Sequence, residues 1–379
     1  MNICLLSAGR RVALLECFRG AMRGLGLTGR VFVVDCSRSA PTFYLADDAW
    51  KVPPCTAPDF VPTLLDLCER ERIRLIVPTI DTELPAYAAH RQDFAAIGVT
   101  VAVSGPETVA IAADKILTHR WLTDNGFPTV RQATPAEVLA RPDEWRFPLI
   151  AKPRGGSAGM GVIRATSPEA LRLAVAERDD LVVQEMAPGR EHTVNLYVDQ
   201  SGRCLCAVPH RRIEVRGGEV SKAVTVKDPG LIAMAKRIAE ALPEARGPLN
   251  FQCFLEPHPS PLPARGEGQG GGVSLIRVIE INPRFGGGYP LTHAAGADFT
   301  RWLLQETVGL PVDAACDDWQ DGLAMLRYDE AVFVPAERIE CRGGSEAPAT
   351  APSSDSRAAQ APLTPRVGAA RSRTTGGRQ

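Results

Sequence analysis

The chain has 379 residues, of which 45% are hydrophobic and 23% charged, a composition typical of a soluble globular protein with two or three domains. Its net charge of -1 gives no overall field that would attract nucleic acid or an anionic membrane. No apolar run reaches the roughly 20 residues that span a bilayer. We find no export signal and no CxxC pair among the 10 scattered cysteines, so we expect reduced thiols, a cytoplasmic location and no nucleic-acid or membrane partner.

The first hundred residues alternate between strand and helix patterns. Buried-strand patterns cover residues 2–8, 30–34, 75–78 and 99–103. Helical patterns between them cover residues 11–25, 60–71 and 84–94. This order predicts a doubly wound parallel sheet, with ligands near the carboxyl ends of its strands.

A dinucleotide site is excluded in this segment, although Asp35 ends the second strand. The first turn reads S-A-G-R-R and holds only Gly9 of the glycines that such a site needs. Charged residues at the strand ends are candidates for docking a substrate, with solvated loop charge as an equal alternative: Arg10, Arg11, Asp81 and Glu83.

A small-residue loop is the first phosphate candidate. Asp114 and Lys115 open a predicted helix over residues 115–125, and a predicted strand over 147–152 leads into RGGSAGMGV at 154–162. The loop is neither a Walker A motif nor a clean G-x-G-x-x-G. It would still expose backbone N–H groups to phosphate, with Lys152 as an added cation.

The rest of the chain is rich in strand patterns. We predict strands at 181–185, 192–198, 204–208, 211–215, 249–255 and 275–281 and helices at 229–242 and 299–308. The Pro- and Gly-rich stretch 257–273 is predicted to be a flexible insertion in a hairpin, and residues 338–379 a disordered tail.

Polar residues that could form a site are most concentrated in residues 276–298, IRVIEINPRFGGGYPLTHAAGAD. Glu280 and Asn282 are two apart on a strand and therefore share a face, with Arg284 and three glycines just beyond. A carboxylate beside an amide and an arginine suits Mg²⁺ bridged to phosphate. Polar residues that simply face water are the alternative.

These motifs occur in a recognisable order: DK before a helix ending in GFPTV, then LIAKPRGGSAGMGV, VVQEMAPGREHTV, NFQCF and VIEINPRFGGG. Over residues 2–310 the chain resembles the ATP-grasp superfamily, most closely the synthetase halves of the carbamoyl phosphate synthase large subunit. The resemblance implies an α/β (α+β) fold: a Rossmann-like domain over 1–112, then a two-lobed ATP-grasp fold with a small lobe over 113–190 and a C-terminal lobe over 191–330.

The resemblance also implies roles for individual residues. Lys115 and Lys152 would hold the α- and β-phosphates of ATP. The lid over the β- and γ-phosphates would be residues 155–161, with Gly155, Gly156, Ser157, Gly159 and Gly161. The adenine and ribose would contact Gln184, Glu185, Met186, Ala187 and Glu191.

The metal ligands implied are Gln252, Glu280 and Asn282, holding two Mg²⁺ (or Mn²⁺) with Glu280 as the bridge. Arg284, Lys152 and Glu280 would be the catalytic residues. For the carboxylate substrate we expect Arg211, Arg212 or Lys222, from their charge alone. We expect structural rather than catalytic roles for His192, His210 and His293.

The function implied is that of an ATP-dependent carboxylate–amine ligase, with small-molecule carboxylate and amine substrates, which could assemble as a homodimer. Two alternatives stay open. One is a carbamoyl-phosphate-synthase-like kinase acting on bicarbonate or carbamate. The other is a non-catalytic ATP-binding protein of the same fold.

Overall fold

The computed structural model describes residues 1–156, 159–176, 178–256, 275–314 and 317–339. Ser157, the predicted insertion at 257–273 and residues 340–379 of the predicted tail lie outside the described residues. In the described part, no helix combines the length and apolar character needed to cross a membrane.

A five-stranded parallel sheet forms the N-terminal part, in the order β3-β2-β1-β4-β5. Its strands are β1 (Asn2–Leu6), β2 (Val31–Asp35), β3 (Asp48–Lys51), β4 (Ile73–Val77) and β5 (Thr100–Val101). Its helices are α1 (Val12–Gly24), α2 (Thr42–Leu45), α3 (Phe60–Arg70), α4 (Leu84–Ala89), α5 (Arg91–Ala96) and α6 (Pro106–Ala113). The predicted doubly wound parallel sheet is confirmed.

Alternate residues of these strands point to opposite faces, and each face has its own core. Ile3 and Leu5 pack with α1, whereas Cys4 and Leu6 pack with α3 and α4. The single helix expected over 84–94 is wrong: α4 and α5 are separate because the backbone leaves the helical conformation at His90, whose ring contacts Asp93 at 2.7 Å.

A six-stranded antiparallel sheet forms the C-terminal lobe, in the order β14-β13-β10-β11-β12-β15. Its strands are β10 (Arg190–Val198), β11 (Cys204–Arg216), β12 (Glu219–Thr225), β13 (Gly247–Glu256), β14 (Leu275–Asn282) and β15 (Ala324–Leu326). The two strands expected at 204–208 and 211–215 are one continuous strand, because β11 pairs across Pro209 with β10. Strand β12 was not predicted from the sequence.

This sheet shares a core with the N-terminal sheet. Helix α10 (Pro229–Ala241) covers one of its faces. On the other face, α11 (Tyr289–Ala294) and α12 (Phe299–Thr307) pack against α1, and Phe285 lies 5.7 Å from Phe18 between ring centroids. The two parts are therefore held together by apolar contacts as well as by the polar contacts of the site.

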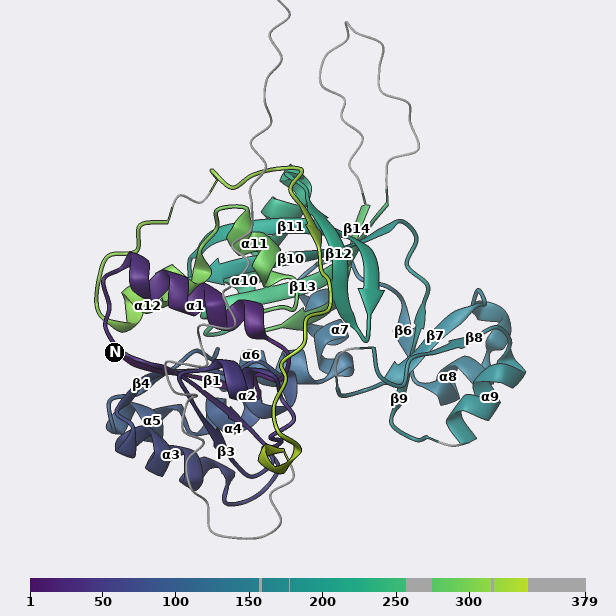
Figure 1. The fold of residues 1–379 in the computed structure, drawn as a ribbon. Coiled ribbons are helices and arrows are strands. Elements are labelled where there is room, and N and C mark those ends of the chain that lie inside the picture. Colours follow the sequence, from purple (N-terminus) through teal and green to yellow (C-terminus); the bar gives the residue numbers. More distant parts are fainter. Residues whose placement is uncertain (157–158, 177, 257–274, 315–316, 340–379) are drawn as a thin grey trace, which may run out of the picture.

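A smaller antiparallel sheet stands to one side of the molecule (Figure 1) and has a separate core. Its order is β6-β9-β7-β8, with strands β6 (Gln132–Ala133), β7 (Leu149–Pro153), β8 (Ile163–Ala165) and β9 (Leu181–Glu185), covered by α8 (Pro135–Ala140) and α9 (Pro168–Ala176). Helix α7 (Lys115–Asp124) connects it to the rest and packs against α6 and β14.

Candidate active site

One face of the six-stranded sheet collects the polar residues of the candidate site. The strand register places Thr193, Gln252 and Glu280 in one row and Asn195, Asn250 and Asn282 in the next. Gln252 lies directly opposite Glu280 across the β13–β14 pair. Asn195 and Asn250 were missed; Asn250 lies two residues before Gln252, a spacing that places both on one face.

The register of β13 and β14 shifts next to this pair. Gln252 is opposite Glu280, but its neighbour Cys253 is opposite Val278, so Ile279 has no partner. Such a bulge bends the strand and re-aims the side chains beside it, which is why bulges are common next to functional sites.

Glu280 is a carboxylate among cations. The Glu280 charge favours the protonated form of Lys115, Lys152 and Arg284, so all three lie within electrostatic range of it. Nowhere in the described part of the chain does the Glu280 side chain form a hydrogen bond or ion pair, which leaves its oxygens free to bind a ligand.

Lys152 is the most perturbed of these cations. It lies on β7 and is only 7% exposed, and burial lowers its pKa to about 8, against the opposing effect of Glu280. Burial of an uncompensated ammonium is unfavourable. An anion placed beside Lys152 would relieve that penalty.

The predicted phosphate loop is tied to Lys115. The Lys115 ammonium donates to the Gly156 carbonyl at 2.9 Å and to Gly155 at 3.4 Å, and its backbone N–H donates to Arg154. Three loop residues have positive φ, a region that favours glycine: Gly156 (82°), Gly159 (66°) and Gly161 (70°).

Gln184, near the end of β9, is buried and forms a hydrogen bond with a residue of β6. Its amide donates to Gln132 at 2.7 Å, and Gln132 donates to the Lys115 carbonyl at 3.1 Å. Glu185 lies 3.8 Å from Arg131. Met186 and Ala187 follow in the short connection from β9 to β10, so they lie at the junction of the two lobes.

Two of the three expected substrate cations are already neutralised. Arg212 donates to Glu191 at 2.7 Å and its side chain is 7% exposed, so it is a buried, paired cation rather than one open to a substrate. Burial raises the pKa of Glu191, and Arg212 opposes that shift. Lys222 pairs with Glu214 at 2.6 Å.

Arg211 does not join the site. Neighbouring residues of a strand point to opposite faces, and Arg211 is paired in register with His192 and lies within electrostatic range of it, away from the row that contains Glu280. We therefore leave Arg211 out of the site.

Arg284 connects the sheet to the N-terminal part. Its guanidinium contacts Asp81 at 2.5 Å, Asn282 Oδ1 at 3.2 Å and the Phe285 carbonyl at 3.0 Å. Burial lowers the pKa of Arg284, but Asp81 outweighs that effect and raises it overall. Arg11 reaches the same Phe285 carbonyl at 3.3 Å.

Arg11 and Asp81 follow β1 and β4, the two strands between which the strand order reverses. In open parallel sheets, ligands bind in the crevice at this switch point. Here the switch point lies beside Arg284 and Glu219, and the Glu219 carboxylate lies 3.7 Å from Arg11. The two candidates from the N-terminal segment thus belong to the site, and Glu219 is a further member that was missed.

Glu83 has a structural role instead. It is completely buried, and it accepts hydrogen bonds from Ser7 at 2.7 Å and from the Thr79 and Ile80 backbones at 2.7 and 3.2 Å. Burial raises its pKa to about 7. These bonds hold the loop that carries Asp81. Arg10, the fourth candidate, is exposed.

The donor set fits a hard cation that also binds phosphate. Glu280 offers carboxylate oxygens, with amide oxygens from Gln252 and Asn282, and Mg²⁺ completes such a set with phosphate oxygens and water. No group of three His, Cys, Asp or Glu side chains able to hold a metal occurs in the described residues. A metal at Glu280 would therefore depend on its nucleotide.

Comparison with family models identifies the fold. Residues 3–102 match the PylC-like N-terminal domain, and residues 112–288 match the ATP-grasp domain. The chain belongs to the ATP-grasp superfamily. The membership and fold expected from the motifs are thereby confirmed.

Two curated relatives are similar over part of their length. Phosphoribosylamine–glycine ligase from Synechocystis sp. is 28% identical over 249 residues, which are 61% of this chain and 57% of that protein. D-alanine–D-alanine ligase from Gloeobacter violaceus is 33% identical over 110 residues, 26% of this chain and 36% of that protein. The chain thus matches little more than half of the first relative's length and about a third of the second's.

Three solved structures share the fold at low identity. The biotin carboxylase domain of Hydrogenobacter thermophilus 2-oxoglutarate carboxylase has a TM-score of 0.64 at 15% identity, covering 85% of this chain and 73% of its own. Carboxyaminoimidazole ribonucleotide synthase from Aspergillus clavatus gives 0.64 at 15%, covering 86% and 81%. L-amino acid ligase from Bacillus licheniformis gives 0.59 at 17%, covering 81% and 74%.

The three glycines after Arg284 allow the turn to approach the polar face. A Cβ would lie 3.0 Å from the Asn195 oxygen at Gly286 and 3.1 Å from Glu219 at Gly287. At Gly288 it would lie 2.6 Å from His210 Nε2. Burial lowers the pKa of His210 to about 3, so this completely buried ring is neutral.

Gly288→Ala is therefore expected to lower the free energy of unfolding by about 1–3 kcal/mol through overpacking against His210. Denaturant titration measures the change. In the His210→Ala background the same substitution should cost less, because the clashing ring is gone. Gly20→Ala is the control: its Cβ meets nothing within 4 Å, and α1 should gain up to about 1 kcal/mol. Equal costs of Gly288→Ala with and without His210 would contradict this packing.

Proposed function

We propose that this protein is an ATP-dependent ligase that activates a small carboxylate as an acyl phosphate and joins it to an amine. One observation carries the proposal. The unpaired Glu280 carboxylate lies among Lys115, Lys152 and Arg284, next to a loop whose glycines can wrap phosphate. Three cations near one carboxylate leave an excess of positive charge, which a metal-bound polyphosphate would neutralise.

We assign the nucleotide to these groups. We assign the phosphates to Lys115, Lys152 and the loop 155–161, the adenine to the connection after Gln184, and the ribose to Glu191. Gln252, Glu280 and Asn282 would hold Mg²⁺, which supplies positive charge to the phosphate oxygens. In support, the related biotin carboxylase domain was crystallised with MgADP. Mn²⁺ in the same place stays a prediction.

The chemistry follows from the poor reactivity of a carboxylate, whose leaving group would be oxide. A carboxylate oxygen attacks the γ-phosphorus of ATP, and ADP leaves with the electrons of the broken P–O bond. An amine nitrogen then attacks the acyl carbon, phosphate leaves, and the nitrogen loses a proton. Arg284 and Lys152 neutralise charge on the transferring group, and the loop 155–161 excludes water.

We place the carboxylate and amine in the switch-point crevice beside Arg284. Its charged groups have both signs, since Arg11 lies near Glu219 and Arg284 near Asp81. Such a crevice suits a substrate that carries an ammonium as well as a carboxylate, such as an amino acid. The names of the two curated relatives, which contain glycine and D-alanine, support this choice over bicarbonate. We therefore no longer assign the substrate carboxylate to Arg212 or Lys222, because both are paired with glutamates.

The oligomeric state and the location of the protein stay predictions. The related biotin carboxylase domain is a dimer, and a homodimer of this chain stays a prediction, as does a cytoplasmic location. Bicarbonate activation stays the alternative function, because the same related domain was crystallised with bicarbonate.

Glu280→Gln should lower ATP turnover by at least ~10²-fold, because the metal loses its carboxylate ligand. The assay measures phosphate release from ATP and Mg²⁺ with pooled amino acids, and in parallel with bicarbonate alone. Glu240→Gln, at an exposed position of α10, is the matched control and should keep wild-type activity. Near-normal turnover of Glu280→Gln would refute the metal site, and dependence on bicarbonate alone would favour the alternative.

The affinity for ATP should weaken as the pH rises through 8. Lys152 has its pKa lowered to about 8 by burial, so it is charged below that pH and loses its charge above it. Deprotonation of a phosphate-binding lysine weakens binding by up to about tenfold per pH unit. Calorimetric titrations between about pH 7 and pH 9.5 measure this slope, with Lys152→Arg as the variant that stays charged. Parallel pH profiles for the two proteins would contradict the role of Lys152.

A further inference from the structure

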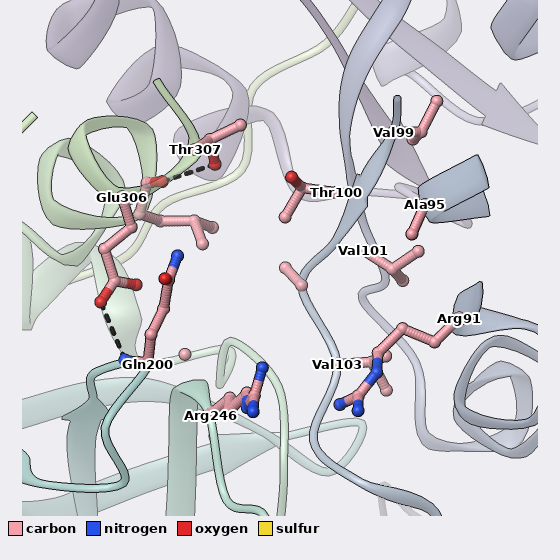
Figure 2. A pocket seen from close by; sticks show the side chains of 13 residues that line it. Arg91, Ala95, Val99, Thr100, Val101, Val103, Gln200, Arg246, Glu306 and Thr307 are labelled. Atoms are coloured by element: carbon pink, nitrogen blue, oxygen red, sulfur yellow. Dashed lines mark hydrogen bonds between the residues drawn. The ribbon is translucent and has the colours of Figure 1, made fainter. Parts of the chain in front are cut away.

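A pocket lies between the N-terminal sheet and the C-terminal lobe (Figure 2), outside the candidate active site. Its volume is about 240 Å³. Helix α5 and β5 form one wall, and α12 and the start of β13 form the other. Gly247, in this pocket, and Gln252, in the active site, are five residues apart on β13, about 17 Å along a strand.

The lower part of the pocket carries two cations. Arg91 pairs with Glu244 at 3.1 Å through Nη2, but its Nη1 is buried and has no hydrogen-bond partner in the described part of the chain. The Arg246 side chain is exposed and forms no ion pair with any described residue. In Figure 2 both guanidinium groups extend into the same region of the cavity. A carboxylate there would satisfy the buried Nη1.

The wall that carries Arg246 also offers acceptors, from α12. Glu306 is held by the Tyr197 hydroxyl at 2.7 Å and by the Gln200 backbone at 3.0 Å, and it lies within electrostatic range of Arg246. Thr307 donates its hydroxyl hydrogen to the Leu303 carbonyl, so its oxygen is left as an acceptor. An ammonium group is the natural partner for a carboxylate such as that of Glu306.

Beside these charged groups the pocket is aliphatic. It is lined there by Ala95, Val99, Val101, Val103 and Leu303. The volume lies just below the range of pockets that take drug-sized ligands, so a smaller molecule fits.

The two walls are already fixed relative to each other. Gly105 donates its N–H to the Glu244 carbonyl at 3.0 Å, and the Ser104 hydroxyl bonds both the N–H and the carbonyl of Arg246, at 3.2 and 3.3 Å. A ligand would therefore enter a preformed site and lose little free energy to ordering it.

We propose that this pocket binds a free aliphatic α-amino acid, with its carboxylate at Arg91 and Arg246, its ammonium at Glu306 and its side chain on the valines of the wall. The ligand bridges the two parts of the chain at a site separate from the catalytic crevice. The proposal does not depend on the proposed ligase activity.

Calorimetric titration of the full chain with L-leucine tests the site without nucleotide. We expect saturable binding at millimolar concentration or below, weakened roughly tenfold or more in Arg246→Ala. Ala95→Leu, at an exposed position of α5, fills the cavity and should abolish binding. The matched control is Arg172→Ala, at an exposed arginine of α9 outside the pocket, which should bind as the wild type does. Thermal melts confirm that each variant is folded.

Three results would overturn the proposal. The first is no saturable binding of L-leucine by the wild type. The second is equal binding by the wild type and by Arg246→Ala or Ala95→Leu, which places the amino acid elsewhere, such as the catalytic crevice. The third is binding of 4-methylpentanoate or inorganic phosphate as tightly as L-leucine, because neither probe has the ammonium group that Glu306 is proposed to hold.

Discussion

Lys115, Lys152 and Arg284 lie around the Glu280 carboxylate, yet none of them forms an ion pair with it within the described residues. Arg284 is paired with Asp81 and Lys115 bonds loop carbonyls, but the buried Lys152 ammonium has no direct partner in the described residues. Such a charge is unfavourable for folding, and a bound anion would recover that free energy. The three cations come from three different places: the start of α7, the strand β7 of the small sheet, and the turn after β14. The small lobe and the C-terminal lobe must therefore be held in one relative position for the site to exist.

Arg284 also fixes the position of the N-terminal sheet relative to this cluster of charges. Asp81 holds its guanidinium from the switch-point crevice, while Arg11 bonds the next carbonyl along the turn. The glycines that follow let this turn lie directly on the sheet, where any Cβ would collide with Asn195, Glu219 or His210. The residues proposed to transfer phosphate and those proposed to hold the substrate are thus parts of one polar cluster over a shared apolar core.

Much of this could be predicted from the sequence. The shared face of Glu280 and Asn282 follows from their two-residue spacing and the period of a strand. The faces of Arg211 and Arg212 could not be predicted, because they depend on the register of β11, a strand whose pattern is interrupted by Pro209. The Glu191–Arg212 and Asp81–Arg284 pairs join residues 21 and 203 positions apart, and only tertiary packing brings them together. Strand β12 and its first residue, Glu219, were missed because polar residues interrupt the alternation of apolar and polar side chains that marks a strand.

Calorimetric titration of ATP into the full chain, with and without Mg²⁺, tests the central claim most directly. If Glu280 binds a metal only together with phosphate, ATP should bind much more tightly with Mg²⁺ than without it, and Mg²⁺ alone should bind weakly. No affinity for ATP in the presence of Mg²⁺, or an affinity that Mg²⁺ does not change, would contradict the account.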